Sequence, residues 1–100
     1  MTSVLHPLIG QRLYRIREQV LHTQLEEEAV LLDLESGRYF SLNSVGGRIW
    51  AQLVERPRTS EELLTDLTEQ YDVSREKAEP DLLALLEDLV TQKLLEVTDR

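Results

Sequence analysis

Residues 30–50 read VLLDLESGRYFSLNSVGGRIW, and their hydrophobic pattern changes from strand-like to helical near position 43. Before that point, residues 29–34 form a mostly apolar run and residues 39–42 resume an extended pattern. The four residues between them supply turn chemistry, with Gly37 free to adopt a positive φ. Two strands joined by a short glycine-containing loop predict a β-hairpin.

A third strand is predicted just upstream of this hairpin. Residues 20–25, VLHTQL, are rich in β-branched and apolar side chains and stop at an acidic triplet. Together with the hairpin they predict a three-stranded antiparallel sheet over residues 19–42. Since a helical pattern follows, the predicted fold class is α+β, a sheet followed by three helices over residues 43–93.

The first predicted helix begins directly after the hairpin. Asn43 or Ser44 can cap it, and its apolar positions recur at three- and four-residue spacing until Pro57 ends it. Gly46 and Gly47 lie in its first turns and weaken it by about 1 kcal/mol each relative to Ala. We expect these glycines to allow a neighbouring segment to approach closely.

The second and third helices also have start signals. Thr59 and Glu62 have the spacing of a capping box, and Ser74 can cap the next helix. Pro80 interrupts the third helical pattern and would clash with the carbonyl of Glu76. We therefore expect either a kink at Pro80 or a fresh helix start with Pro80 in its first turn.

Both ends of the chain are open to two interpretations. Residues 1–18 fit a short helix as well as an extended chain, and residues 94–98 fit a strand as well as a frayed tail. Neither internal repeats nor a linker interrupt the 100 residues, so we expect one domain over residues 1–100.

The composition excludes several classes of function. The chain has 19 acidic and 11 basic residues, a net charge of −8, whereas nucleic-acid binders need a positive face. It has no cysteine, which removes disulfides and thiolate sites, and it has no apolar run of membrane-spanning length. Its amino terminus lacks the features of a signal peptide. We expect a cytoplasmic protein that binds neither nucleic acid nor membrane.

No catalytic constellation is visible. His6 and His22 are the two histidines, and neither lies in a metal-binding or catalytic motif. Pairs of carboxylates such as Glu61 and Glu62 are typical of solvated helix faces and caps. We therefore expect no enzymatic activity, no metal and no cofactor.

The third helical pattern carries an apolar stripe of roughly 160°, wider than the ~100° that one core-facing side requires. One interpretation is that the helix is buried between the sheet and the other helices. The other is that one flank of the stripe lines an apolar groove beside a sheet edge. An unpaired edge strand beside such a groove can receive an extended peptide.

The combination of LLDL, SGRY, LN and IW within residues 30–50 resembles the signature of PqqD-like proteins, the precursor-peptide recognition elements of ribosomal natural-product pathways. The resemblance continues through EEL at residues 61–63, YDVS at residues 71–74 and DLLALLEDLV at residues 81–90. It covers residues 20–97. It implies a three-stranded sheet followed by a winged helix-turn-helix-like bundle of three helices.

The resemblance also implies a binding mode. Family members bind the leader segment of a precursor peptide as an extra strand on the third strand, against the third helix. In this chain these elements correspond to residues 38–42 and to residues from about 81 to 92. The implied peptide-binding residues are Arg38, Tyr39, Phe40, Ser41, Leu42, Asp81, Leu82, Leu85, Asp88 and Leu89. Strand alternation leaves open whether the Phe40 and Leu42 face or the Tyr39 and Ser41 face meets the peptide.

Two positions depart from the family pattern. Lys93 stands where members often have Gly before the closing apolar pair, and Pro80 interrupts a helix that members usually continue. Neither position lies in the implied strand–helix groove.

The style of the signature is similar to the small recognition proteins of lasso-peptide clusters. That subgroup implies a leader peptidase, and possibly a cyclase, as partners. The alternative within the family is delivery of a precursor peptide to a radical enzyme in cofactor biosynthesis.

Two further functions of other classes remain open. A winged-helix shape suggests a DNA-binding regulator, but the third helix offers Asp81, Glu87 and Asp88 where a reading helix needs basic or amide side chains. A self-pairing structural module is the second, and a mass that depends on concentration without any peptide would favour it.

Overall fold

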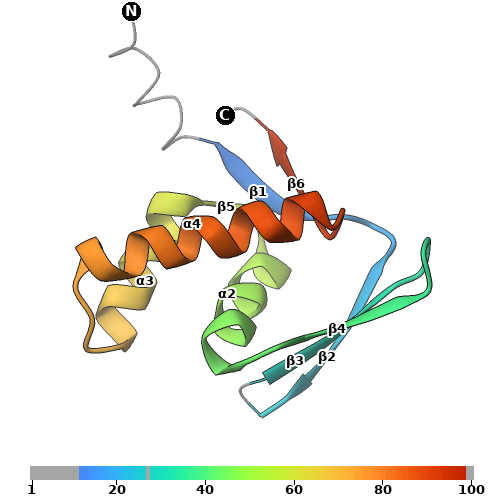
Figure 1. Cartoon of the computed structure of the whole chain (residues 1–100), viewed down its shortest axis with the longest axis horizontal. Helices are drawn as coiled ribbons and strands as arrows, with labels where there is room; N and C mark the ends of the chain where they lie inside the picture. Colours follow the sequence, from blue (N-terminus) through green and yellow to red (C-terminus); the bar gives the residue numbers. More distant parts are fainter. Residues whose placement is uncertain (1–11, 27, 99–100) are drawn as a thin grey trace, which may run out of the picture.

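The computed structural model describes residues 12–26 and 28–98. The elements follow one another in the order β1 (Leu13–Ile16), β2 (Val20–Leu25), β3 (Glu28–Asp33), β4 (Arg38–Leu42), α2 (Ser44–Glu55), β5 (Arg58–Thr59), α3 (Ser60–Gln70), α4 (Arg75–Thr91) and β6 (Leu95–Thr98). A three-stranded antiparallel sheet followed by three helices confirms the predicted α+β fold class. Figure 1 shows α4 running across the molecule, with α2 and α3 below it and the β2–β3–β4 sheet at the lower right.

The first sheet has the order β2-β3-β4, with β3 in the middle. The register pairs Leu31 with His22 on one side and with Phe40 on the other. Burial alternates along β3, where Ala29, Leu31 and Asp33 are buried and the residues between them are half-buried. One face of the sheet is therefore turned towards the helices, as the period of two requires.

A second sheet, in the order β5-β1-β6, brings together three segments that are far apart in the chain. Leu13 of β1 pairs with Thr59 of β5 and with Thr98 of β6. The strand interpretations of residues 13–16 and 95–98 are therefore correct, and the helical and frayed interpretations of these residues are wrong. The expectation for residues 1–11 lies outside the described part of the chain.

Each helix begins at a predicted cap. The Asn43 side chain accepts a hydrogen bond from the Gly46 amide at 3.0 Å. Thr59 and Glu62 form the complete capping box, and Ser74 accepts from the Lys77 amide. A Cβ at Gly46 would lie 3.3 Å from the Cβ of Leu42, which confirms close approach at this glycine.

The third helix differs from its prediction. It runs unbroken from Arg75 to Thr91 with Pro80 inside it, so the fresh start at Pro80 and the family-derived start near Asp81 are wrong. The Ser74 side chain accepts a hydrogen bond from a free amide of the first turn, and the exposed ring of Pro80 lies on the solvent side of the helix. The proline is tolerated because the opposite side of the helix is buried against the rest of the protein.

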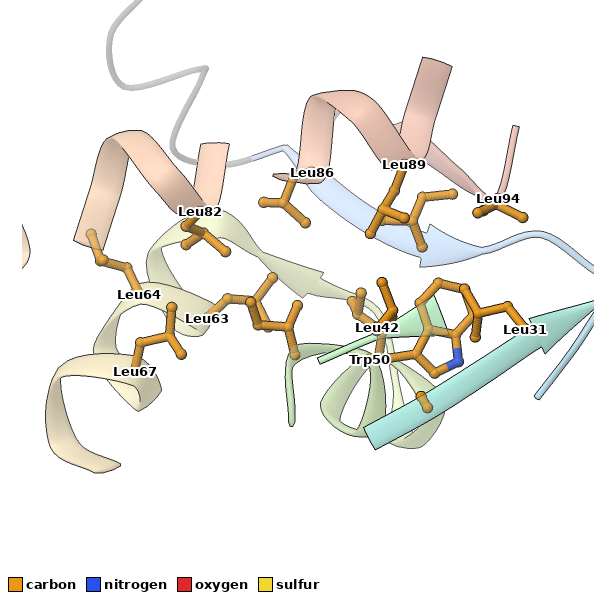
Figure 2. Close-up of a cluster of buried hydrophobic side chains, with 14 of the residues drawn as sticks. Leu31, Leu42, Trp50, Leu63, Leu64, Leu67, Leu82, Leu86, Leu89 and Leu94 are labelled. Carbon is orange, nitrogen blue, oxygen red and sulfur yellow. The ribbon is translucent and has the colours of Figure 1, made fainter. Parts of the chain in front are cut away.

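One hydrophobic core joins the sheets to the helices (Figure 2). Trp50 is its largest side chain and is completely buried, and Leu31 and Leu42 pack on it from the first sheet. From α4, Leu82, Leu86 and Leu89 point into the same core. A buried side chain of this size contributes about 1.5–3 kcal/mol relative to an exposed one, so this cluster holds the elements in place.

The turn between β3 and β4 is built around a buried carboxylate. The Ser36 hydroxyl donates to Asp33 at 2.8 Å, and the Glu35 amide donates to the same carboxylate at 3.1 Å. The hydrogen bond from Ser36 is the main cause that lowers the pKa of Asp33 below its ordinary value. Gly37 adopts a φ of +76°, which confirms the positive φ expected there.

Within residues 12–26 and 28–98, no helix combines the length and the apolar character needed to cross a membrane.

Candidate peptide-binding site

The β4 strand is an edge of its sheet. It pairs with β3 on one side, and its other side pairs with no strand in the part of the chain that the structure describes. The backbone groups on that side are available to an incoming strand. Figure 1 shows β4 leading from the hairpin to the start of α2.

The two faces of β4 differ in burial. Leu42 belongs to the core and half-buried Phe40 packs against it, whereas Tyr39 on the opposite face is 72% exposed. The Arg38 guanidinium lies over the Phe40 ring, 5.0 Å from its centroid, in a cation–π contact. The Phe40 and Leu42 face is therefore the one turned towards the helices.

The α4 helix presents a mixed flank beside its buried side. Ala78, Leu82, Leu86 and Leu89 are buried at helical spacing. Asp81, Leu85 and Asp88 each precede one of these buried leucines by one residue, so they lie on the neighbouring flank of the helix. Leu85 is half-buried there, and the two aspartates are exposed. A partly apolar strip with acidic side chains thus runs along the edge of the buried side.

An apolar hollow of about 400 Å³, here called the α2–α4 hollow, lies at one end of this strip. Asp81, Leu82 and Leu85 of α4 line it, opposite Val45 and Ile49 of α2 and Tyr71 at the end of α3. Val45 comes three residues after the end of β4, so a peptide lying along β4 would reach this hollow directly.

A second hollow of about 270 Å³, here called the hairpin hollow, lies at the other end of β4. It is lined by the β3–β4 turn, including Arg38, and by Thr91, Gln92 and Lys93 at the end of α4. The strand β4 begins at the hairpin hollow and ends near the α2–α4 hollow. The helix α4 runs in the opposite direction between the same two hollows. The two hollows therefore mark the ends of one path between β4 and α4. A five-residue strand spans roughly 17 Å of that path.

The predicted site residues occupy different places along this path. Arg38 lines the hairpin hollow, whereas Asp81, Leu82 and Leu85 line the α2–α4 hollow. Leu42 and Leu89 are buried in the core, and exposed Asp88 lines neither hollow. Tyr39 and Ser41 lie on the face of β4 opposite to Phe40.

Sequence reasoning missed the part of the site that comes from other helices. Val45, Ile49 and Tyr71 line the α2–α4 hollow but lie outside the expected strand and third helix. The four-residue spacing of Val45 and Ile49 signals one face of α2, but only tertiary packing shows that α4 stands opposite.

The charges along the path have opposite signs on its two walls. Arg38 stands on the β4 side, whereas Asp81 and Asp88 stand on the α4 side. Among the residues that the structure describes, no three His, Asp or Glu side chains gather in a way that could hold a metal ion. The arrangement supplies backbone hydrogen-bonding groups, apolar hollows and complementary charge, which are the elements of strand addition.

Residues 28–95 match the family model described as coenzyme PQQ synthesis protein D (PqqD). The chain belongs to the PqqD family. No curated protein sequence matches this PqqD-family chain significantly.

Two solved structures are similar to this PqqD-family chain. One, described as TbiB1 in complex with the TbiA(beta) leader peptide, is 38% identical with a TM-score of 0.77; the match covers 82% of this chain and 94% of that one. The other, lasso peptide synthetase B1 complexed with the leader peptide, is 30% identical with a TM-score of 0.73, and the match covers 83% and 96%. Both neighbours were therefore solved with a leader peptide.

Proposed function

We propose that this PqqD-family chain binds the leader segment of a ribosomally made precursor peptide as an added β-strand. The leader pairs with the free side of β4 and lies against the flank of α4 that carries Asp81, Leu85 and Asp88. The observation that carries the proposal is the unpaired β4 edge with a hollow at each of its ends. The similarity of this chain to two proteins solved with leader peptides supports the same function.

The maturation pathway in this proposal is of the lasso-peptide type. An identity of 30% to a lasso peptide synthetase B1, over nearly the whole of that chain, supports this branch over delivery to a radical enzyme. The chain acts by binding alone and in the cytoplasm, and it presents the leader to a leader peptidase and a cyclase. The proposed groove residues are Arg38, Tyr39, Phe40, Ser41, Asp81, Leu82, Leu85 and Asp88, while Leu42 and Leu89 support the groove from the core.

The charge of α4 disfavours a DNA-binding regulator. Asp81, Glu87 and Asp88 are exposed on this helix and would face the phosphates of a duplex. An extended basic or neutral peptide fits the same surface without that repulsion.

The test is a titration of the chain with fluorescent leader peptides from small precursor genes encoded beside it, followed by fluorescence polarisation. We expect saturable binding that weakens on the order of tenfold or more in the Leu85→Asp variant, because a carboxylate then replaces an apolar contact in the α2–α4 hollow. Leu89→Asp is unsuitable, because Leu89 is buried and its replacement would unfold the protein.

The matched control is Leu83→Asp on the same helix. Leu83 is 37% exposed and does not line the α2–α4 hollow, so this variant should bind the leader as the original chain does. Circular dichroism of each sample checks that the fold is retained. A folded Leu85→Asp variant with unchanged affinity would contradict the proposed groove.

A further inference from the structure

A third hollow lies at the opposite end of α2 from the proposed leader site. It has a volume of about 400 Å³, and we call it the arginine hollow. The β1–β2 segment lines one side of it and the last turn of α2 with Pro57 lines the other. It shares no lining residue with the α2–α4 hollow, so it is a separate surface.

The lining of the arginine hollow has two chemical parts. Ile16, Val20, Leu53 and Val54 supply apolar walls, and Val54 is 45% exposed. Three arginines supply positive charge, namely Arg15, Arg17 and Arg56. A hollow that combines apolar walls with a few charged groups is typical of a ligand site, and its volume falls in the usual range.

The positive charge in this hollow is only partly neutralised. Glu55 is held by Arg58 at 2.7 Å, and Arg56 is held by Glu62 at 3.2 Å. The remaining charged side chains of the hollow are Arg15, Arg17 and Glu18. Neither arginine forms an ion pair within residues 12–26 and 28–98. This local excess of positive charge occurs in a chain whose net charge is −8.

Arg17 provides the most specific observation. Its Nε atom is buried and finds no hydrogen-bond acceptor among the described residues. A buried donor on a charged group destabilises the folded state when it has no acceptor, so such donors are rare in native proteins. The backbone of Arg17 is fixed by its amide, which donates to the Leu94 carbonyl at 3.1 Å, so the base of the side chain is held in place.

We propose that the arginine hollow is a second peptide site, which takes an acidic side chain next to an apolar residue from a partner protein, with the carboxylate pairing with Arg15 and Arg17, which line the hollow. A carboxylate is the acceptor that a guanidinium pairs with best, since its two oxygens match the fork of donors. The apolar neighbour fills the walls formed by Val54 and Leu53. This site goes beyond leader binding, because it would hold a partner while the β4 edge stays free for the leader.

The test uses the full ¹⁵N-labelled chain and follows the arginine Nε–Hε resonances by NMR. The probe is the peptide acetyl-Leu-Asp-Leu-Asp-amide, and its two comparisons are the same peptide with Asn in place of Asp and inorganic phosphate. We expect a saturable shift of the Arg17 resonance with the acidic peptide and binding on the order of tenfold weaker with the Asn peptide. Phosphate should not saturate the site, since it lacks the apolar part.

Two variants assign the site. Arg17→Gln should weaken the acidic peptide on the order of tenfold, and Arg15→Gln gives a second reading if the first variant fails to fold. The matched control is Arg75→Gln, which makes the same charge change at an exposed arginine at the start of α4. Leader binding should be unchanged in all three, which separates this proposal from the proposed function. No saturable shift, or an equal response to the Asn peptide or to phosphate, would overturn it.

Discussion

Lys93 adopts a backbone conformation that suits glycine better than lysine. Its φ is +64°, in the left-handed region, where a side chain costs roughly 1–2 kcal/mol. The amides of Lys93 and Leu94 donate to the carbonyls of Val90 and Leu89, which is the hydrogen-bond pattern of a Schellman motif. Lys93 therefore occupies a left-handed position at the end of the helix, where glycine is the usual residue.

Lys93→Gly is expected to raise the free energy of unfolding by about 1 kcal/mol, because glycine adopts this φ without strain. Urea unfolding followed by the fluorescence of Trp50, the single tryptophan of the chain and completely buried, measures the change. Lys77→Gly is the matched control, since the same substitution inside α4 should lower the free energy by about 1 kcal/mol. A loss of stability in Lys93→Gly would contradict this account of the α4 end.

Residue patterns predicted the local chemistry of this fold well. The caps at Asn43, Thr59 and Ser74 and the turn glycine Gly37 all lie as expected, because each depends on neighbours within a few positions. The buried Nε of Arg17 had no such signal, because its burial comes from packing between distant segments.

At the scale of elements, α4 shows packing overriding a local breaker. Pro80 stands six positions after the Ser74 cap, yet the helix continues to Thr91. A proline in a helix interior removes one backbone hydrogen bond and normally disfavours the helix by about 3 kcal/mol. The buried leucines that follow, together with the capped first turn, offset that cost.

Pro80→Ala is expected to raise the free energy of unfolding by about 1–2 kcal/mol. The gain is smaller than the full helical penalty of proline, because proline also restricts the unfolded chain. Urea unfolding compares this variant with Glu79→Ala, an exposed neighbour whose replacement should change little. Equal effects in the two variants would show that Pro80 adopts its place without strain.

The second sheet is the element that local pattern could not predict. Its strands have four, two and four residues, too short for a clear alternation. Each strand is specified by its pairing with the others, and the three strands lie far apart in the chain. The buried side chains of Leu94 and Leu95 at the start of β6 anchor this sheet to the core.

At the scale of the molecule, leader binding should be linked to stability. A ligand that binds only the folded chain stabilises it by about 2.7 kcal/mol at one hundred times its Kd. For a chain of 100 residues this corresponds to a rise in Tm of roughly 10–20 °C. Thermal unfolding followed by Trp50 fluorescence, with and without the leader, measures the rise.

The same measurement on Leu85→Asp distinguishes the proposed groove from other surfaces. That variant should show little rise at the same leader concentration, whereas Leu83→Asp should show the full rise. An equal rise in both variants would place the leader away from the α2–α4 hollow.

By itself, the sequence determined the order of strand and helix in the first sheet and the three-helix region, the helix caps and the family. These features follow from hydrophobic period and short-range hydrogen bonding, which neighbouring residues specify. Only the tertiary structure decided the second sheet and the continuity of α4 through Pro80. It also decided that α2 faces α4 across one hollow and the β1–β2 segment across another. The physical reason is that burial, and the contacts between elements far apart in the chain, depend on how whole elements pack. No local sequence pattern encodes that arrangement.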